Sequence, residues 1–123
     1  YVYAGKASGG LFASTEDIAS FVSAGMTGSY QKDHGVLEPD AIEMLYKPQV
    51  EMAGFYAQAF NYYGLGHLIE ILSDGTIAVS HGGQGAGIMT HYHSVPEDGR
   101  GFVILTKRQR SWPFIAYILS DWA

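Results

Sequence analysis

The second half of the chain is a series of short strand-like segments, and in the first of them, at 62–71, the residues follow a period of two. Four such segments are present, at 62–71, 76–80, 88–95 and 101–107. Successive side chains of a strand point to opposite faces of a sheet, so a period of two predicts strands. The segments are separated by glycine-containing turns at 73–76 and 96–99 and by a glycine-rich stretch at 81–87. Short turns join antiparallel neighbours, so we expect a four-strand antiparallel meander.

Three helices are expected beside this sheet. Ser14 offers a capping hydroxyl and Asp17 a carboxylate three residues later, which is a helix-start signal. The buried face of this helix is expected to consist of Ile18, Phe21, Val22 and Gly25. A second helix is expected from Pro39 to Tyr46, with Ile42, Leu45 and Tyr46 buried. The third opens at Trp112, and its buried face is expected to be Phe114, Tyr117, Ile118 and Trp122. Helices flanking an antiparallel sheet make an α+β fold.

Composition narrows the class of protein. The chain has 123 residues, of which 47% are hydrophobic and 15% charged, as in one packed domain or a piece of one. The net charge of −5, with no basic patch beyond 107–110, argues against a nucleic-acid partner. No run of 18 apolar residues is present, so we expect no membrane span in this segment. Residues 1–5 begin without a methionine or a helix cap, and we expect a fragment.

The most informative segment is 80–87 (SHGGQGAG), where four glycines follow a strand within six residues. Glycines there allow a ligand to approach the backbone closely. His81 and Gly83 are two residues apart and should share one face of the sheet. A side chain at Gly83 would block access to the backbone, while a backbone N–H could point into a pocket. A glycine-rich hairpin with an exposed histidine is the alternative interpretation.

Four segments in this order carry a family resemblance. Residues 9–21 (GGLFASTEDIASF) resemble the Gly-Gly-Leu-x-Ser-Thr-x-x-Asp-Leu-x-x-Phe segment of the serine β-lactamase and penicillin-binding-protein-like hydrolases. Residues 63–67 (YGLGH) resemble that family's Tyr-Gly-Leu-Gly-Trp strand. Residues 80–83 (SHGG) are similar to its third catalytic motif in the His-x-Gly form, and 102–107 (FVILTK) to the strand that follows. The spacings between the four also match.

The resemblance implies covalent acyl transfer, in which a serine of a Ser-x-x-Lys motif attacks an amide or ester carbonyl. It also implies that residues 1–123 fold as the C-terminal part of a β-lactamase-like or DD-peptidase-like domain. No cofactor is expected. His81 would contact the substrate, Gly82 and Gly83 would let it approach, and the N–H of Gln84 would be one of two oxyanion donors. We expect an exported protein, periplasmic, extracellular or bound to the cell envelope, and the absence of cysteine is compatible with export.

Two departures from the family pattern limit the chemistry. Ser29 and Lys32 match Ser-x-x-Lys only formally, in a polar loop and after the Gly-Gly-Leu segment, and no Tyr-x-Asn motif occurs. The chain should therefore be inactive alone and needs the missing N-terminal part of the domain or a second chain. His81 also stands where β-lactamases and transpeptidases usually carry lysine, which favours an esterase or D-aminopeptidase over a β-lactamase or DD-peptidase. A small α+β binding or interaction module without enzymatic activity remains the alternative.

Three further expectations follow. His91 and His93 share a strand face and could join His81 at a zinc ion, although two ordinary polar residues explain the pattern as well. The basic segment 107–110 could receive a substrate carboxylate or be a solvated turn. The strand at 76–80 should be paired on both sides, with His81 opening onto a groove, and the chain should expose apolar surface where a partner segment packs.

Overall fold

The structure is a computed structural model that describes residues 4–30 and 37–122. Its helices are α1 (Lys6–Gly9), α2 (Thr15–Ala24), α3 (Pro39–Tyr46) and α4 (Trp112–Trp122), with 3-10 turns at Gly28–Tyr30 and Gly54–Gln58. Its strands are β1 (Val50–Glu51), β2 (Tyr62–Tyr63), β3 (Leu68–Ile71), β4 (Ile77–Gly85), β5 (Ile88–Val95) and β6 (Arg100–Thr106). The expected α+β class is confirmed.

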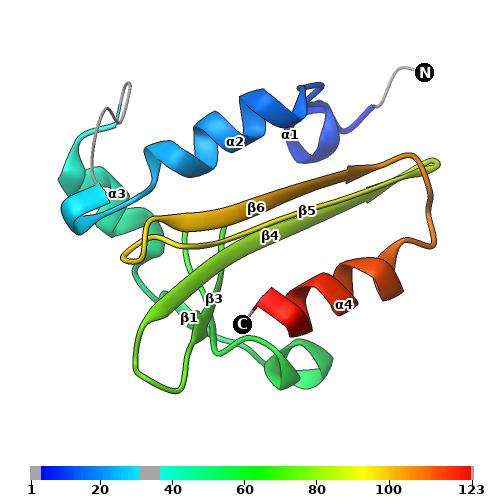
Figure 1. The fold of residues 1–123 in the computed structure, drawn as a ribbon. Coiled ribbons are helices and arrows are strands. Elements are labelled where there is room, and N and C mark those ends of the chain that lie inside the picture. The colour runs from blue at the N-terminus through cyan, green and yellow to red at the C-terminus, as the bar shows by residue number, and fades with distance from the viewer. Residues whose placement is uncertain (1–3, 31–36, 123) are drawn as a thin grey trace.

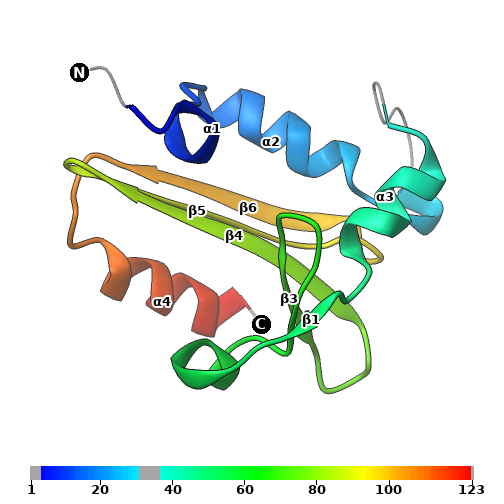
Figure 2. The same cartoon turned by 180° about the vertical axis from the view of Figure 1, so that it is seen from behind.

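The six strands form one antiparallel sheet in the order β1-β2-β3-β4-β5-β6, so every strand pairs with its neighbours in sequence. Helix α2 covers one face of this sheet and α4 covers the other (Figures 1 and 2). The largest fully buried apolar side chains are those of Ile42, Ile69, Val79, Val95 and Ile115. None of the helices in the described part of the chain is long and apolar enough to cross a membrane.

The start of α2 matches the sequence prediction. The Ser14 hydroxyl accepts a hydrogen bond from the Asp17 N–H at 3.1 Å, and the Asp17 carboxylate accepts one from the Ser14 N–H at 3.0 Å. The bond from the Ser14 N–H favours the ionised form of the carboxylate, so it lowers the pKa of Asp17. The capping box fixes where α2 begins and thereby which of its residues face the sheet.

The expected strand at 62–71 is interrupted. It forms two strands, β2 and β3, because residues 64–67 turn the chain back on itself. Gly66 has a φ of +78°, which a residue with a side chain rarely adopts. The N–H of Gly64 donates to the His67 carbonyl at 2.8 Å and closes this turn. Together with the two-residue strand β1, which was not predicted, this interruption makes the meander six strands instead of four.

The glycine-rich stretch is strand for most of its length. We expected the strand to stop at Ser80, but β4 continues to Gly85 and pairs with β5 from Val79 to Gly85. Pairing with a long neighbour therefore overrides the poor strand propensity of glycine. The strand expected at 88–95 is confirmed, since β5 has those bounds.

The expected buried face of the last helix is partly wrong. Phe114 and Tyr117 are 54% and 65% exposed, and Ile115 is the buried residue of α4. Ile118 and Trp122 are half-buried. Residues 115, 118 and 122 follow the i, i+3, i+7 spacing of one helix face, so this face packs on the sheet and turns Phe114 and Tyr117 outward.

Candidate functional site

The candidate site begins where β4 loses one of its two neighbours. Residues Ile77–Ser80 pair with β3, and from Val79 onward β4 also pairs with β5. Val79 and Ser80 therefore have strand partners on both sides, whereas Ile77 and Ala78 pair with β3 alone, so the expectation that 76–80 would be paired on both sides is only partly confirmed. Beyond Ser80 strand β3 has ended, so His81–Gly85 has a strand partner on the β5 side only. The chain thus presents an open strand edge at its glycine-rich segment.

The hydrogen-bond pattern fixes which backbone groups face this open edge. Hydrogen-bonded pairs alternate along an antiparallel ladder. The Leu72 N–H donates to the Thr76 carbonyl at 2.9 Å. In the register of β3 and β4, the next hydrogen-bonded pairs are Glu70 with Ala78 and Leu68 with Ser80. The N–H groups of Gly82 and Gln84, two and four residues further along β4, point the same way, toward the edge that β3 leaves open.

His81 lies at the wall of an apolar groove of about 480 Å³. The groove is lined by Leu11, Ala13, Asp17, Ile18, Phe21, Gly66, His81 and Tyr92. The groove lies between the sheet on one side and α2, together with the segment before α2, on the other. Among these eight residues, Asp17 has an acidic side chain and His81 a basic one. None of the eight is a serine, a cysteine or a lysine. The expectation that His81 opens onto a groove is confirmed.

Apolar side chains around this groove are unusually exposed. Leu11 and Phe12, in the segment before α2, are 78% and 82% exposed, and Phe21 and Leu65 are about half exposed. Contiguous apolar surface of this kind is typical of a contact site for another segment or molecule. The structure therefore agrees with the expectation that this face carries uncovered apolar surface.

His81 lies close to two tyrosines, Tyr63 on β2 and Tyr92 on β5. The Tyr63 hydroxyl lies 3.4 Å from Nε2 of His81, and the two rings meet at an edge-on angle of 65°. Tyr92 lies directly opposite His81 in the register of β4 and β5. Burial, followed by the nearby Tyr46 and Tyr63, raises the pKa of Tyr92, so its phenol stays protonated at neutral pH. Tyr63 is the first residue of the YGLGH segment noted in the sequence, whereas Tyr92 was given no role there.

A second histidine, His67, lies behind the groove. Its ring stacks on Phe21 at 6.4 Å and meets Tyr46 and Tyr92 edge-on at 5.0 and 6.0 Å. Burial lowers its pKa most strongly; a hydrogen bond to the Leu65 carbonyl raises it, and the charge of His81 lowers it again. A carbonyl only accepts, so Nδ1 of His67 carries the hydrogen and donates it at 3.0 Å. A signal existed in the sequence, because His67 lies in the YGLGH segment.

The two glycines after His81 differ in what they accommodate. Gly83 shares its face with His81, as predicted, and a Cβ added there would lie 2.8 Å from the Thr90 hydroxyl. Gly82 faces the other side, where a Cβ would lie 3.3 Å from Nδ1 of His91. Both positions therefore disfavour a side chain, and the backbone around Gln84 stays accessible from the open edge.

The basic segment 107–110 lies against the tip of the hairpin formed by β4 and β5. The Gln109 side-chain amide donates to the Gly85 carbonyl at 3.3 Å. This contact brings three cations, Lys107, Arg108 and Arg110, to the glycine-rich end of β4. Both interpretations of the segment, anion recognition and a solvated turn, are compatible with this placement.

The three-histidine zinc site is wrong. His91 and His93 lie on the face covered by α4, where His91 meets Trp112 and His93 meets Trp122. His81 pairs across from Tyr92 and so faces the opposite side of the sheet. Among the residues that the structure describes, no cluster of three or more histidine, cysteine or acidic side chains could hold a metal ion.

Among the residues that the structure describes, no serine, cysteine or lysine lines the groove. Ser29 lies in an exposed 3-10 turn, and Lys32, its formal partner, lies outside the described residues. Comparison of the chain with protein-family models, with curated proteins and with solved structures finds no match. Any function must therefore be argued from the site itself.

Proposed function

We propose that this chain supplies one wall of the active site of a serine acyl hydrolase of the β-lactamase and penicillin-binding-protein type. The observation that carries the proposal is the open, glycine-rich edge of β4, with His81 at a groove and the Gln84 N–H aimed at the same edge. A fixed N–H beside an accessible cleft is what acyl transfer needs to stabilise a developing oxyanion.

The proposal gives each of these residues a role. The carbonyl of an amide or ester would lie along the β4 edge, its oxygen receiving a hydrogen bond from the Gln84 N–H. His81 would contact the substrate or the tyrosine of the family's Tyr-x-Asn motif. Tyr63 would orient the imidazole of His81. Gly82 and Gly83 would let the substrate approach the backbone closely.

The nucleophile would come from residues of the same polypeptide outside these 123. The groove beside His81 has the apolar walls that a helix carrying the Ser-x-x-Lys motif would bury. Attack by that serine would form an ester with the acyl group and expel the amine or alcohol. Water would then hydrolyse the acyl-enzyme and restore the serine.

The test is to determine the coding sequence upstream of Tyr1, express the longer polypeptide and incubate it with a reactive ester or a β-lactam. We expect a mass increase equal to one acyl group on a serine of an upstream Ser-x-x-Lys motif. Residues 1–123 alone should stay unmodified. A longer polypeptide without that motif, or without any acyl adduct, would refute the proposal.

A second function is supported by the same open edge. Its unpaired backbone groups could bind an extended peptide as an additional strand, without chemistry. The same experiment separates the two functions. Peptide binding by residues 1–123 without acylation of the longer polypeptide would favour an interaction module.

A further inference from the structure

His67 lies where the aromatic groups behind the groove meet. Its ring stacks on Phe21 of α2 at 6.4 Å and meets Tyr92 of β5 edge-on at 6.0 Å. Phe21 and Tyr92 also meet each other edge-on at 6.0 Å, so the three rings form a closed triangle between α2 and the sheet. Phe21 and Tyr92 line the groove beside His81. His67 is only 5% exposed and supports both of these walls from behind.

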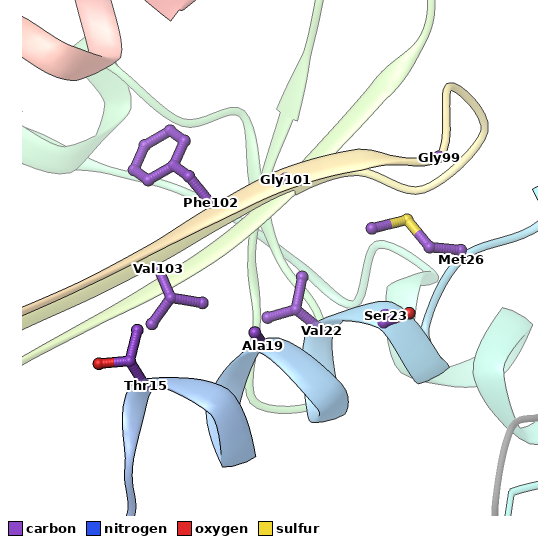
Figure 3. Close-up of a pocket in the computed structure, with 9 residues that line it drawn as sticks. All are labelled: Thr15, Ala19, Val22, Ser23, Met26, Gly99, Gly101, Phe102 and Val103. Carbon is purple, nitrogen blue, oxygen red and sulfur yellow. The ribbon is translucent and has the colours of Figure 1, made fainter.

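Helix α2 contacts the sheet at two places. On the β6 side Val22 is buried, and Figure 3 shows the side chain of Val103 directed from β6 toward α2. On the β5 side the contact is the triangle of Phe21, His67 and Tyr92. The first contact is aliphatic, whereas the second contains an imidazole, whose ring nitrogens can also form hydrogen bonds.

The hydrogen bonds of His67 close the turn at residues 64–67. Its Nδ1 donates to the Leu65 carbonyl at 3.0 Å, and its own carbonyl accepts a bond from the Gly64 N–H at 2.8 Å. The Leu65 N–H donates in turn to the Leu45 carbonyl of α3 at 3.2 Å. The turn is therefore fixed by His67 from within and by α3 from outside.

This turn begins directly after Tyr63, the residue that contacts His81. The hydroxyl of Tyr63 lies 3.4 Å from Nε2 of His81. Tyr63 belongs to β2, a strand of two residues that pairs with β1 and β3 over those two residues only. Because so short a strand gives little support by itself, the direction of the tyrosine ring depends on the turn that follows it.

We infer that His67 is a positioning residue for His81, acting through the turn at 64–67 and Tyr63. The ring of His67 holds the turn against α2 and β5, and its Nδ1–H fixes the shape of the turn. Tyr63 then carries this position to the imidazole of His81. Histidine suits both tasks because it combines a flat aromatic ring with a hydrogen-bond donor in the ring plane. Phenylalanine would provide only the ring, and asparagine only the donor.

The value of this positioning for catalysis rests on the proposed function, but the positioning itself does not. The side-chain nitrogen resonances of histidine-labelled protein report the surroundings of His81 in residues 1–123 without any reaction. Ester hydrolysis by the longer polypeptide tests the proposed function. The two proposals can therefore fail separately.

His67→Phe tests the path from His67 to His81. It keeps a ring but removes the bond to Leu65, so we expect the His81 resonance to shift. In a Tyr63→Phe background the same substitution should shift this resonance much less, because the hydroxyl that connects the turn to His81 is gone. His93→Phe is the matched control. His93 is as buried as His67 but lies on the face covered by α4, so the His81 resonance should not move.

His67→Asn separates positioning from packing. Its side-chain amide can take the place of the Nδ1–H and donate to the Leu65 carbonyl, but it offers no ring to Phe21 and Tyr92. The asparagine variant should therefore be less stable in urea than His67→Phe and yet keep the His81 resonance closer to that of the wild type. A side chain that only fills space would give the same order of variants in both measurements.

Three results would overturn the inference. The first is a folded His67→Phe variant whose His81 resonance is unchanged. The second is a shift of equal size with and without the Tyr63 hydroxyl, because His67 would then act by another route. The third is a His67→Phe variant that does not fold, because the role of His67 would then lie in stability instead of position.

Discussion

The Tyr63 hydroxyl lies 3.4 Å from Nε2 of His81, although the two residues belong to strands β2 and β4. Strand β3 separates the two strands along Ser80 and ends before His81. The side chains can therefore meet across the opening that the end of β3 leaves. This contact fixes the imidazole at the mouth of the groove and connects the broken strand β2–β3 to the candidate site.

Replacing Tyr63 with phenylalanine should release His81 without changing the fold. One hydrogen bond of about 1 kcal/mol would be lost, while the ring would keep its packing. We expect the side-chain nitrogen resonance of His81 to shift, with the melting temperature almost unchanged. NMR of histidine-labelled protein measures this directly. An unchanged His81 resonance would mean that Tyr63 does not position it.

Acidification should destabilise the chain through His91 and His93. Burial lowers the pKa of each to about 4, and His81 and His91 respectively add a smaller repulsion. Nε2 of His91 and Nδ1 of His93 are buried without a hydrogen-bond partner. The unfolded chain binds protons near pH 6.5, where the folded chain does not. The free energy of unfolding should therefore fall between about pH 6.5 and pH 4, by up to about 3 kcal/mol per histidine.

Urea unfolding across this pH range measures the effect. Glu70 acts in the opposite direction, because burial raises its pKa and its protonation favours the folded state. The variants His91→Phe and His93→Phe isolate the histidine contribution. Each should flatten the pH dependence, and a dependence that is unchanged in the double variant would contradict the account.

Gly64→Ala should destabilise the turn between β2 and β3. An added Cβ would lie 2.8 Å from the Leu45 carbonyl oxygen and 3.2 Å from that of Lys47, both backbone atoms that cannot move freely. We expect a loss of about 1–3 kcal/mol in unfolding free energy. Gly85→Ala is the control, because its Cβ would meet no atom within 4 Å. Equal stability of the two variants in chemical denaturation would refute this packing.

Ser14→Ala should remove the cap of α2 and lower the unfolding free energy by about 1 kcal/mol. The lost bonds are those between Ser14 and Asp17. Ser20→Ala, on the same helix, removes a hydroxyl that only donates to the Glu16 carbonyl, so it should be neutral or slightly stabilising. Thermal melts of both variants distinguish the cap from a general effect of removing a serine.

Local signals predicted the fold where they act over a few residues. The Ser14 and Asp17 pair fixed the start of α2, and the glycine-rich stretch at 81–87 and the turn at 96–99 gave the bounds of β5. Non-local pairing decided the rest. The glycines of 82–85 are poor strand formers, yet they extend β4 because β5 lies beside them. The outward turn of Phe114 and Tyr117 depends on how α4 sits on the sheet, which an apolar pattern on both faces of the helix cannot specify.

The sequence predicted only part of the candidate site, because the rest of the site also depends on non-local pairing. His81, Gly83 and Gln84 lie in one glycine-rich segment, which composition alone makes conspicuous. Tyr63 and His67 come from the YGLGH segment and Tyr92 from β5, and only the sheet register brings them to His81. The zinc hypothesis failed because the register of β4 and β5 pairs His81 with Tyr92, which places His81 on the opposite face from His91 and His93.

The most direct test of the central claim is ester hydrolysis by the longer polypeptide and three variants, with folding checked by thermal melts. His81→Ala should lower the rate by about 10²–10³, the usual cost of losing one positioned polar group. Gln84→Ala should have little effect because the backbone N–H survives, and Gln84→Pro should be severe because proline has no N–H. If His81→Ala and Gln84→Pro both hydrolyse the ester at the wild-type rate while well folded, this edge of β4 is not the oxyanion wall.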